Sequence, residues 1–388
     1  MDLKQFQMEL ETLTLFHRIL EDEIVDLLIQ TIDDSTYYCR LCSKIYDQGA
    51  NISDYIYKMV MNDENIYVLN KAKNKTIVPS IENSLKRELK ILQKLCDLKS
   101  KEVHIQSDIE YPEWENTSYS LEKDYYQRIE DLPKKGYGIF AKYFVFGIDE
   151  QGLYPIRHPD TQSLKEMTGY QQQRNVLIKN TLALLQGMKA NNALLYGDAG
   201  TGKSSTIKAI VNEYHTEGLR LIEVKKKQIA QLPSIIEMLA DNPLKFIIFI
   251  DDLSFSSNDD DYIALKNILE GSTTSNKMNV VIYATSNRRH FMKETFSDRE
   301  GDEMHRNDTI QETMSLAARF GLTITFQKPG SNLYMEIVKQ YAKEYELNLD
   351  EHELKIKAEA FAIRNNGRSA RTAKQFVEYE KINQSILD

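Results

Sequence analysis

The segment with the most specific chemistry is GDAGTGKS, which begins at Gly197 and ends at Ser204. It fits the pattern G-x-x-x-x-G-K-[ST] of a phosphate-binding loop, also called the P-loop or Walker A motif. Its glycines let backbone N–H groups turn toward a phosphate, Lys203 supplies a point charge to the β- and γ-phosphates, and the Ser204 hydroxyl reaches Mg²⁺. An apolar strand precedes the loop and a helix with an apolar face follows it, which supports a true nucleotide site. The nucleotide-binding residues that we expect are Gly197, Asp198, Ala199, Gly200, Thr201, Gly202, Lys203, Ser204 and Ser205.

An acidic pair, Asp251 and Asp252, comes directly after the apolar run FIIFI at residues 246–250 and forms a Walker B motif. Ligands of open α/β sheets bind at the carboxyl ends of the strands. We therefore expect Asp251 to join Ser204 in holding Mg²⁺, and Asp252 to orient and deprotonate the attacking water. The alternative is a strand followed by a capping aspartate. That alternative leaves an acidic pair downstream of a P-loop without a chemical role.

Three later polar residues complete the candidate catalytic set. Asn287 ends the run VVIYATSN, and its amide is expected to bind the water or the γ-phosphate between two neighbouring strand ends. A plain turn asparagine is the alternative. Arg319 precedes the last expected strand and Arg371 lies near the start of the last expected helix. Each arginine fits a surface position, but the order of the motifs makes both candidates for γ-phosphate and transition-state contacts.

Alternating strands and helices must position these residues. After residue 165 the apolar runs at 193–196, 219–224, 246–250, 280–285 and 322–326 read as strands, with helical patterns between them. This alternation predicts an α/β fold with a parallel sheet flanked by helices. The strands are apolar throughout, as strands buried on both faces are. Three helical segments at about 333–347, 351–363 and 369–386 end the sequence.

Taken in order, these motifs resemble the AAA+ ATPase superfamily. Segments such as IDDLSF, from Ile250 to Phe255, and IYATSNRRH, from Ile282 to His290, resemble more narrowly a bacterial AAA+ family labelled as a domain of unknown function. The resemblance covers residues 134–388. It implies ATP and Mg²⁺ as ligands, a C-terminal helical lid, Asn287 as sensor 1 and Arg371 as sensor 2.

Arg319 resembles the arginine finger, which in AAA+ rings acts on the ATP of the neighbouring subunit. The resemblance therefore implies a homo-oligomer, because each active site is complete only at a subunit interface. One position departs from the superfamily. Most AAA+ proteins have Glu where Asp252 stands, and a carboxylate one methylene shorter leaves slow turnover open. The narrower family also has Asp there.

The sequence before residue 134 carries no motif that points to a function. Phe6, Leu10, Leu13, Leu20, Ile24 and Leu27 fall on one helical seam if His17 fills the gap, which favours a helix packed in a small bundle with His17 half-buried. Glycines and prolines between residues 134 and 164 indicate a linker. We therefore expect a mostly helical N-terminal domain at 1–133, a linker at 134–164, the AAA+ domain at 165–328 and a lid at 329–388.

The amino-acid composition narrows the class of protein further. The 388 residues are 41% hydrophobic and 28% charged, and no apolar run approaches the roughly 20 residues of a membrane-spanning helix. We expect a cytoplasmic protein with no membrane partner. Its net charge of −9 argues against broad nucleic-acid binding, so Lys225 to Lys227 and the pair Arg288-Arg289 are read as a solvated strand end and as phosphate or acidic contacts. Cys39 and Cys42 are read as reduced thiols.

Two function classes remain after this reading. The first is an ATP hydrolase whose homo-oligomer remodels an unknown protein or nucleoprotein target. The second is a slow-turnover, ATP-dependent binding switch that resembles replication initiators and helicase loaders. A small-molecule kinase fits poorly, because it leaves Arg319 and Arg371 without roles. Nucleic acid as a partner is not indicated but stays open.

Overall fold

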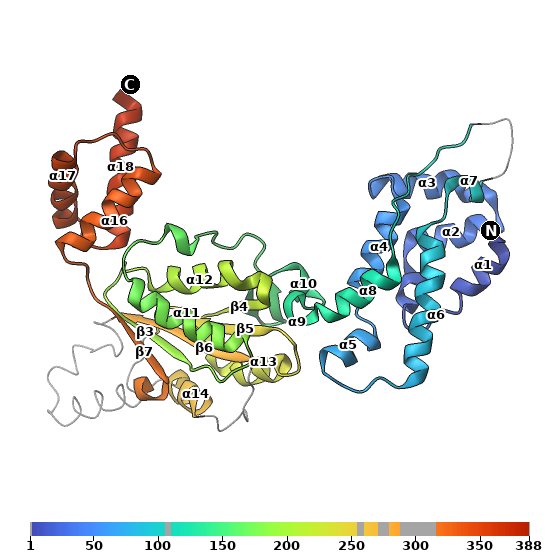
Figure 1. Ribbon diagram of the computed structural model, residues 1–388, viewed down its shortest axis with the longest axis horizontal. Helices are drawn as coiled ribbons and strands as arrows, with labels where there is room; N and C mark the ends of the chain where they lie inside the picture. The colour runs from blue at the N-terminus through green and yellow to red at the C-terminus, as the bar shows by residue number, and fades with distance from the viewer. Residues whose placement is uncertain (1, 105–109, 254–259, 271–278, 288–315, 388) are drawn as a thin grey trace. The chain divides into compact units, whose positions relative to one another are not determined.

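The computed structural model describes residues 2–104, 110–253, 260–270, 279–287 and 316–387 (Figure 1). The chain divides into two compact units, Met1–Lys142 and Tyr143–Asp388. The stretch expected to be a linker, residues 134–164, is therefore divided between the two units. Within the described ranges no helix is long and apolar enough to cross a membrane.

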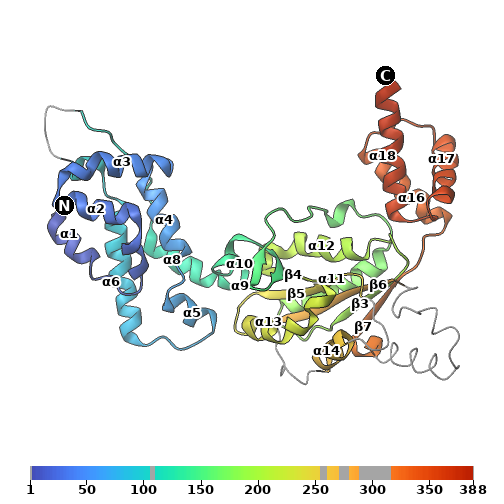
Figure 2. The ribbon, with the colours of Figure 1, turned by 180° about the vertical axis from the view of Figure 1, so that it is seen from behind.

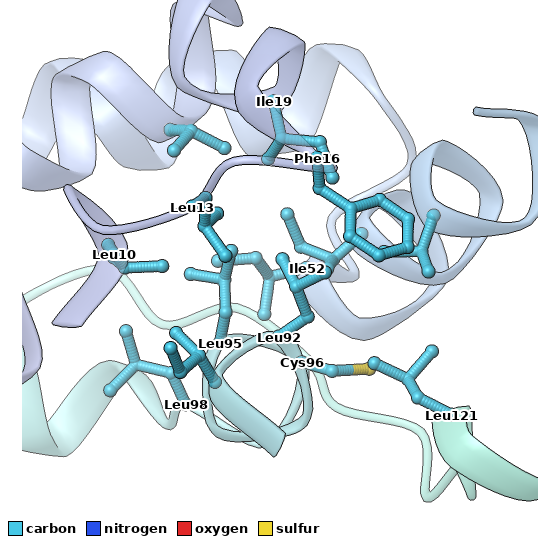
Figure 3. Close-up of a cluster of buried hydrophobic side chains, with 14 of the residues drawn as sticks. Leu10, Leu13, Phe16, Ile19, Ile52, Leu92, Leu95, Cys96, Leu98 and Leu121 are labelled. Atoms are coloured by element: carbon cyan, nitrogen blue, oxygen red, sulfur yellow. The ribbon is translucent and has the colours of Figure 1, made fainter. Parts of the chain in front are cut away.

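The first unit is helical, with a core centred on one long helix. The helix α6 carries Leu85, Leu89, Leu92 and Leu95 on its buried face, and helices from both sides in sequence pack their apolar residues against it. Figure 3 shows Leu10, Ile52 and Leu121 converging on Leu92 and Cys96. The α-helices are α1 (Leu3–Leu10), α2 (Glu23–Asp33), α3 (Tyr38–Asp47), α4 (Ile52–Asn62), α5 (Ile66–Ala72), α6 (Pro79–Cys96), α7 (Ser100–Val103), α8 (Leu121–Glu130), α9 (Leu132–Lys135) and α10 (Ile139–Lys142).

The seam from Phe6 to Leu27 does not form one helix, so that sequence-based expectation was wrong. The helix α1 ends at Leu10, a 3-10 turn follows at His17–Glu21, and α2 begins at Glu23. His17 is exposed, whereas Leu13 and Phe16 are buried in the core despite the break. The spacing thus identified core residues correctly but not the backbone that presents them.

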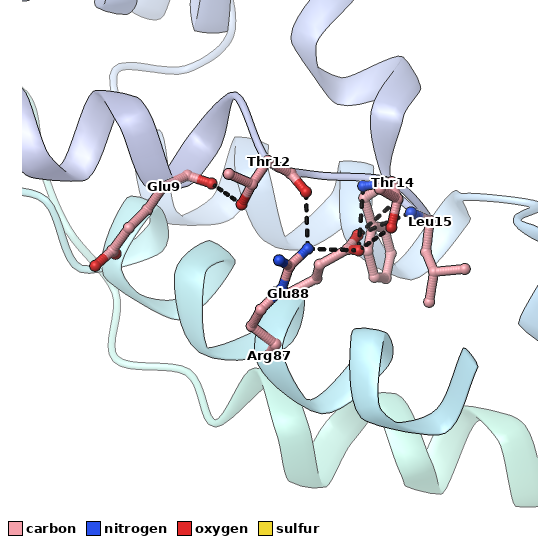
Figure 4. A network of polar contacts seen from close by, with 7 residues as sticks. Glu9, Thr12, Thr14, Leu15, Arg87 and Glu88 are labelled. Carbon is pink, nitrogen blue, oxygen red and sulfur yellow. Dashed lines mark hydrogen bonds and ion pairs between the residues drawn. The ribbon is translucent and has the colours of Figure 1, made fainter. Parts of the chain in front are cut away.

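A buried carboxylate explains the break. Glu88 of α6 is fully buried and accepts hydrogen bonds from the backbone N–H groups of Thr14 (3.1 Å), Leu15 (2.9 Å) and Phe16 (3.1 Å), and from the Thr14 hydroxyl (2.5 Å), as Figure 4 shows in part. Hydrogen bonds to a charged acceptor are stronger than neutral ones. Three consecutive N–H groups therefore point at Glu88 and do not continue a helix.

We expect Glu88→Ala to lower the free energy of unfolding of the N-terminal unit by about 3 kcal/mol, because three backbone N–H groups lose their shared buried acceptor. Trp114, the only tryptophan of the chain, reports on this unit, since its indole is buried and donates to the Leu98 carbonyl. Denaturant unfolding followed by its fluorescence measures the change. The exposed Glu122→Ala on α8 is the control and should stay within about 0.5 kcal/mol. Equal stability of the Glu88 variant and the wild type would contradict this role.

The second unit is built on a sheet of seven strands within its described residues. Their order is β2-β1-β4-β5-β6-β3-β7, and every neighbouring pair is parallel except the hairpin of β1 and β2. The α/β fold with a mostly parallel sheet is confirmed. The strands are β1 (Val145–Asp149), β2 (Gly152–Pro155), β3 (Ala193–Gly197), β4 (Leu219–Val224), β5 (Lys245–Ile250), β6 (Val280–Asn287) and β7 (Leu322–Phe326).

The sequence analysis did not foresee β1 and β2, because it read their glycines as linker residues. Gly147 lies inside β1, where a Cβ atom would come within 2.4 Å of the Tyr154 ring on β2. Gly152 has a φ of +117° at the turn between the strands. These glycines therefore serve a close cross-strand contact and a tight turn of a hairpin at the sheet edge.

Helices cover both faces of the sheet. Leu177 and Leu184 of α11 and Ile207 and Ile210 of α12 share one apolar cluster with the strands, so these two helices cover the same face. Figures 1 and 2 show α13 and α14 on the opposite face. The bounds are α11 (Gln171–Leu185), α12 (Lys203–Tyr214), α13 (Leu232–Leu239) and α14 (Asp260–Leu269).

The chain ends in a three-helix bundle with its own core. The helices α16 (Ser331–Glu344), α17 (Glu351–Arg364) and α18 (Ala370–Leu387) follow β7. Tyr334, Val338, Ala358 and Phe376 are buried between them. This is the helical lid that the sequence predicts.

Candidate functional site

The P-loop connects β3 to α12 by a backbone that favours glycine at three places. Gly197, Gly200 and Gly202 have φ values of +144°, +75° and +88°. A Cβ atom on Gly197 would lie 2.0 Å from the carbonyl oxygen of Phe326 on β7. The loop therefore lies directly against the neighbouring strand, and its turn precedes the N-terminus of α12, where free N–H groups and the helix dipole attract anions.

The ammonium group of Lys203 is held inside the loop. Its Nζ donates to the carbonyl oxygens of Asp198 (2.8 Å) and Gly197 (3.0 Å) and to Oδ1 of Asn287 (3.1 Å). Burial lowers the pKa of Lys203, and the carboxylates of Asp198, Asp252 and Asp251 oppose that shift. The charge is thus desolvated and surrounded by neutral acceptors, which is a favourable starting point for binding a phosphate.

The acidic pair lies next to the hydroxyl end of the loop. Oδ1 of Asp251 accepts hydrogen bonds from the hydroxyls of Ser204 (2.6 Å) and Thr285 (2.6 Å) and from the backbone N–H of Asp252 (3.1 Å). Because the Ser204 hydroxyl donates its hydrogen to Asp251, the lone pairs of that hydroxyl oxygen stay available to a cation. An exposed carboxylate beside a hydroxyl oxygen is a donor set that suits Mg²⁺, which prefers oxygen ligands and retains several waters.

Asp252 and Asn287 form a second polar pair. The Asn287 amide Nδ2 donates to Oδ1 of Asp252 at 2.8 Å, while its Oδ1 accepts from Lys203. The sheet order explains this bridge, because β6 lies between β5, which ends before Asp252, and β3, which leads into the loop. Asp252 has a φ of +51°, in the left-handed region.

These residues line a cleft of about 730 Å³. Its floor is formed by the P-loop and the ends of β5 and β6, and α16 and α18 of the lid contribute Tyr341, Arg371 and Lys374. A cleft of this volume lies within the range of small-ligand sites, about 300–1,000 Å³. The sequence-predicted site residues that line it are Ala199, Gly200, Thr201, Gly202, Lys203, Ser204, Ser205, Asp251, Asp252, Asn287 and Arg371.

The lid and the loop are joined by backbone contacts. The N–H of Arg371 donates to the Gly200 carbonyl at 3.2 Å. Asp198 donates its own N–H to Phe326 and accepts the N–H of Lys328 on its carboxylate at 2.9 Å. Asp198 therefore bonds to the segment between β7 and the lid rather than lining the cleft.

Arg319 is not among the residues that line the cleft. It lies in a helical stretch at residues 316–319 and forms an ion pair with Glu270, which follows α14. The structure therefore does not bring Arg319 to the site of its own chain. Arg288 and Arg289 lie outside the described residues.

Sequence reasoning missed one wall of the cleft and one residue of its floor. Met167, Tyr170 and Arg174 line the wall; the Arg174 guanidinium donates to the Met167 carbonyl at 2.8 Å, and the Tyr170 hydroxyl donates to the Gln327 carbonyl at 2.6 Å. Nothing in their local sequence marks them. Thr285 in the floor had a signal, since it lies two residues before Asn287 on the same strand and therefore on the same face.

The fold and this cleft together have the parts of a AAA+ module: a mostly parallel sheet, a P-loop and a C-terminal bundle of helices. Residues 141–383 match the family described as "Protein of unknown function (DUF815)". Since this match spans more than half of the 388 residues, the chain belongs to that family. No curated protein matches the chain.

Solved structures of RuvB from Thermotoga maritima are also similar to this chain. A RuvB variant is 16% identical with a TM-score of 0.40, and the similarity covers 58% of this chain and 66% of that one. The structure titled as the RuvB Holliday junction branch migration motor is 16% identical with a TM-score of 0.38 and the same coverage. This chain thus spans slightly less than two thirds of these two RuvB chains.

Proposed function

We propose that this protein is a Mg²⁺-dependent ATP hydrolase that acts as a homo-oligomer. One observation carries the proposal: a single cleft holds the Lys203 ammonium, the Ser204–Asp251 pair and the Asp252–Asn287 pair. Phosphoryl transfer requires a cation at the phosphates, oxygen ligands for a metal and a base for water. Each requirement has a residue in this cleft.

Each polar residue of the cleft has a separate role in the proposed hydrolysis. The N–H groups of the P-loop bind the β-phosphate, and Lys203 exchanges its carbonyl acceptors for the more strongly charged phosphate oxygens. Ser204 and Asp251 hold Mg²⁺, which neutralises charge on the phosphates when bound. Asp252 accepts the proton of the attacking water, Asn287 orients that water, and Arg371 reaches the γ-phosphate from the lid.

A slow-turnover binding switch is the second candidate, and one contact favours it. The Asn287 amide donates to Oδ1 of Asp252, so one of the two oxygens that could take up the proton of the water is already engaged. In that case ATP would set the conformation of the lid, and hydrolysis would reset it slowly. The target in either case is an unknown protein or nucleoprotein.

Arg319 provides the test of the oligomer. If it acts on the ATP of a neighbouring subunit, we expect Arg319→Ala to retain ATP binding and lose hydrolysis. Mixing it with Lys203→Ala should then restore activity, because some interfaces combine an intact P-loop with an intact arginine. The measurements are phosphate release, with and without DNA, and particle size with and without ATP.

The matched control for Arg319→Ala is Arg364→Ala, an exposed arginine at the end of α17. It should keep wild-type activity. A monomer that hydrolyses ATP fully would rule out action in trans. A wild type that binds ATP but releases no phosphate would refute hydrolysis and leave the binding switch.

A further inference from the structure

Thr285 bonds to both aspartates of the site through one hydroxyl, to the carboxylate of Asp251 and to the backbone of Asp252. It lies on β6 and is only 2% exposed. Its Oγ1 donates to Oδ1 of Asp251 at 2.6 Å and accepts the backbone N–H of Asp252 at 2.9 Å. A hydroxyl has one proton, so the donation to Asp251 fixes the direction of its lone pairs and aligns one with Asp252.

The strand β6 also fixes the turn that follows β5 at three consecutive residues. The Thr285 carbonyl accepts the N–H of Leu253 at 2.7 Å, and the Ser286 hydroxyl donates to the Leu253 carbonyl at 2.8 Å. Asn287 bonds the Asp252 side chain. The left-handed backbone of Asp252 is a strained conformation that persists only where surrounding contacts determine it. These contacts from β6 do so.

In the part of the chain that the structure describes, the hydrogen bonds to the Asp251 carboxylate fall on only one of its two oxygens, and this indicates a second role for Thr285. Three donors converge on Oδ1: Ser204, Thr285 and the N–H of Asp252. Among the described residues, no hydrogen bond is made to Oδ2. Thr285 thus helps fix the rotation of the carboxylate so that one oxygen is anchored and the other is presented to a cation.

We propose that Thr285 is a positioning residue for the ATP hydrolysis proposed above. Its hydroxyl orients the Asp251 carboxylate toward Mg²⁺ and holds the Asp252 peptide so that the Asp252 carboxylate reaches the water. In this proposal Thr285 acts through the two aspartates and not by binding the nucleotide or the metal. This inference rests on the proposed function.

Thr285→Val and Thr285→Ser test the role, because valine keeps the shape without the hydroxyl and serine keeps the hydroxyl. Loss of a residue that orients a metal ligand typically costs about 10–100-fold in metal affinity or activity. We expect Thr285→Val to lower kcat and to raise the half-saturating Mg²⁺ concentration by factors in that range. Binding of ATP without Mg²⁺, measured by calorimetry, should change by less than about threefold. Thr285→Ser should recover most of both losses.

Thr181→Val is the matched control. Thr181 of α11 is also fully buried, and its hydroxyl bonds to the Leu177 carbonyl and the Tyr283 hydroxyl, away from the cleft. Equal losses in the Thr181 and Thr285 variants, or no rescue by serine, would show a general packing effect and overturn the proposal. The proposal would also be overturned if the wild type hydrolyses ATP and Thr285→Val has the same kcat and the same Mg²⁺ dependence as the wild type.

The two proposals fail in different ways. If the wild type binds ATP without hydrolysing it, the proposed hydrolysis is refuted, and the Mg²⁺ dependence of ATP binding decides the role of Thr285. A weaker Mg²⁺ effect in Thr285→Val would then support positioning of Asp251, and an unchanged effect would overturn it. A wild type that binds no nucleotide overturns both.

Discussion

We expect Lys203→Ala to abolish ATP binding at concentrations where the wild type is saturated. A hydrogen bond to a charged group contributes about 1.5–3 kcal/mol, and Lys203 is proposed to make such bonds to two phosphates. Loss of about 3 kcal/mol or more weakens binding by more than about 100-fold. The substitution also removes the donor that bridges the Gly197 and Asp198 carbonyls, so the loop loses its internal support as well. Isothermal titration with ATP measures the effect.

Lys208→Ala is the control for this experiment. Lys208 lies on the same helix, α12, and pairs with Glu223 on β4 at 3.1 Å, away from the cleft. Its loss should leave ATP affinity unchanged, because Lys208 does not line the cleft. The variant alters the net charge and the composition of α12 in the same way as Lys203→Ala does. Tight ATP binding by Lys203→Ala would remove the basis for the nucleotide site.

We expect Asp252→Asn to keep ATP binding and to lose hydrolysis. General base catalysis contributes about 10²–10⁴-fold, and an amide cannot take up the proton of the attacking water. The substitution should leave the fold intact, because Asn tolerates the left-handed backbone at this position and its amide oxygen can still accept from Asn287. Phosphate release in single turnovers, beside ATP affinity, separates the two effects.

Asp149→Asn is the matched change for Asp252→Asn, since Asp149 is an exposed carboxylate at the end of β1 that bonds only to the backbone of Gln151 among the described residues. It should hydrolyse ATP at the wild-type rate. Undiminished turnover in Asp252→Asn would mean that another group accepts the proton.

The fold could be predicted where chemistry and periodicity agree locally. The P-loop, the apolar strands and the three lid helices each occupy a continuous stretch, and the confirmed fold contains all of them. The hairpin of β1 and β2 was missed because its glycines read as linker residues, and because β4, the strand with which β1 pairs, lies more than 60 residues later in the sequence. The break after Leu10 was missed for the same reason, since Glu88 that holds it lies on α6.

In the site, too, the residues that belong to local motifs could be predicted and those held by distant contacts could not. Lys203, Ser204, Asp251 and Asn287 were selected from motifs, and the structure brings them together in one cleft; their catalytic roles stay predictions. The wall of Met167, Tyr170 and Arg174 has no motif, because the Tyr170 and Arg174 side chains donate to backbone carbonyls, those of Gln327 and Met167, which any residue type can supply. Arg319 differs from the others, since its proposed role needs a second copy of the chain.

The positive φ of Asp252 has a consequence for which residues this position accepts. Asp and Asn enter the left-handed region more readily than other residues with a side chain, because their short polar groups bond to the nearby backbone. Glu, the residue of most AAA+ proteins at this place, lacks that preference. Sequence drift between the two acids would therefore require a change in the backbone of the turn as well as in the base. The short side chain of Asp252 therefore fits the left-handed backbone at this position, and a Glu side chain would not fit it equally well.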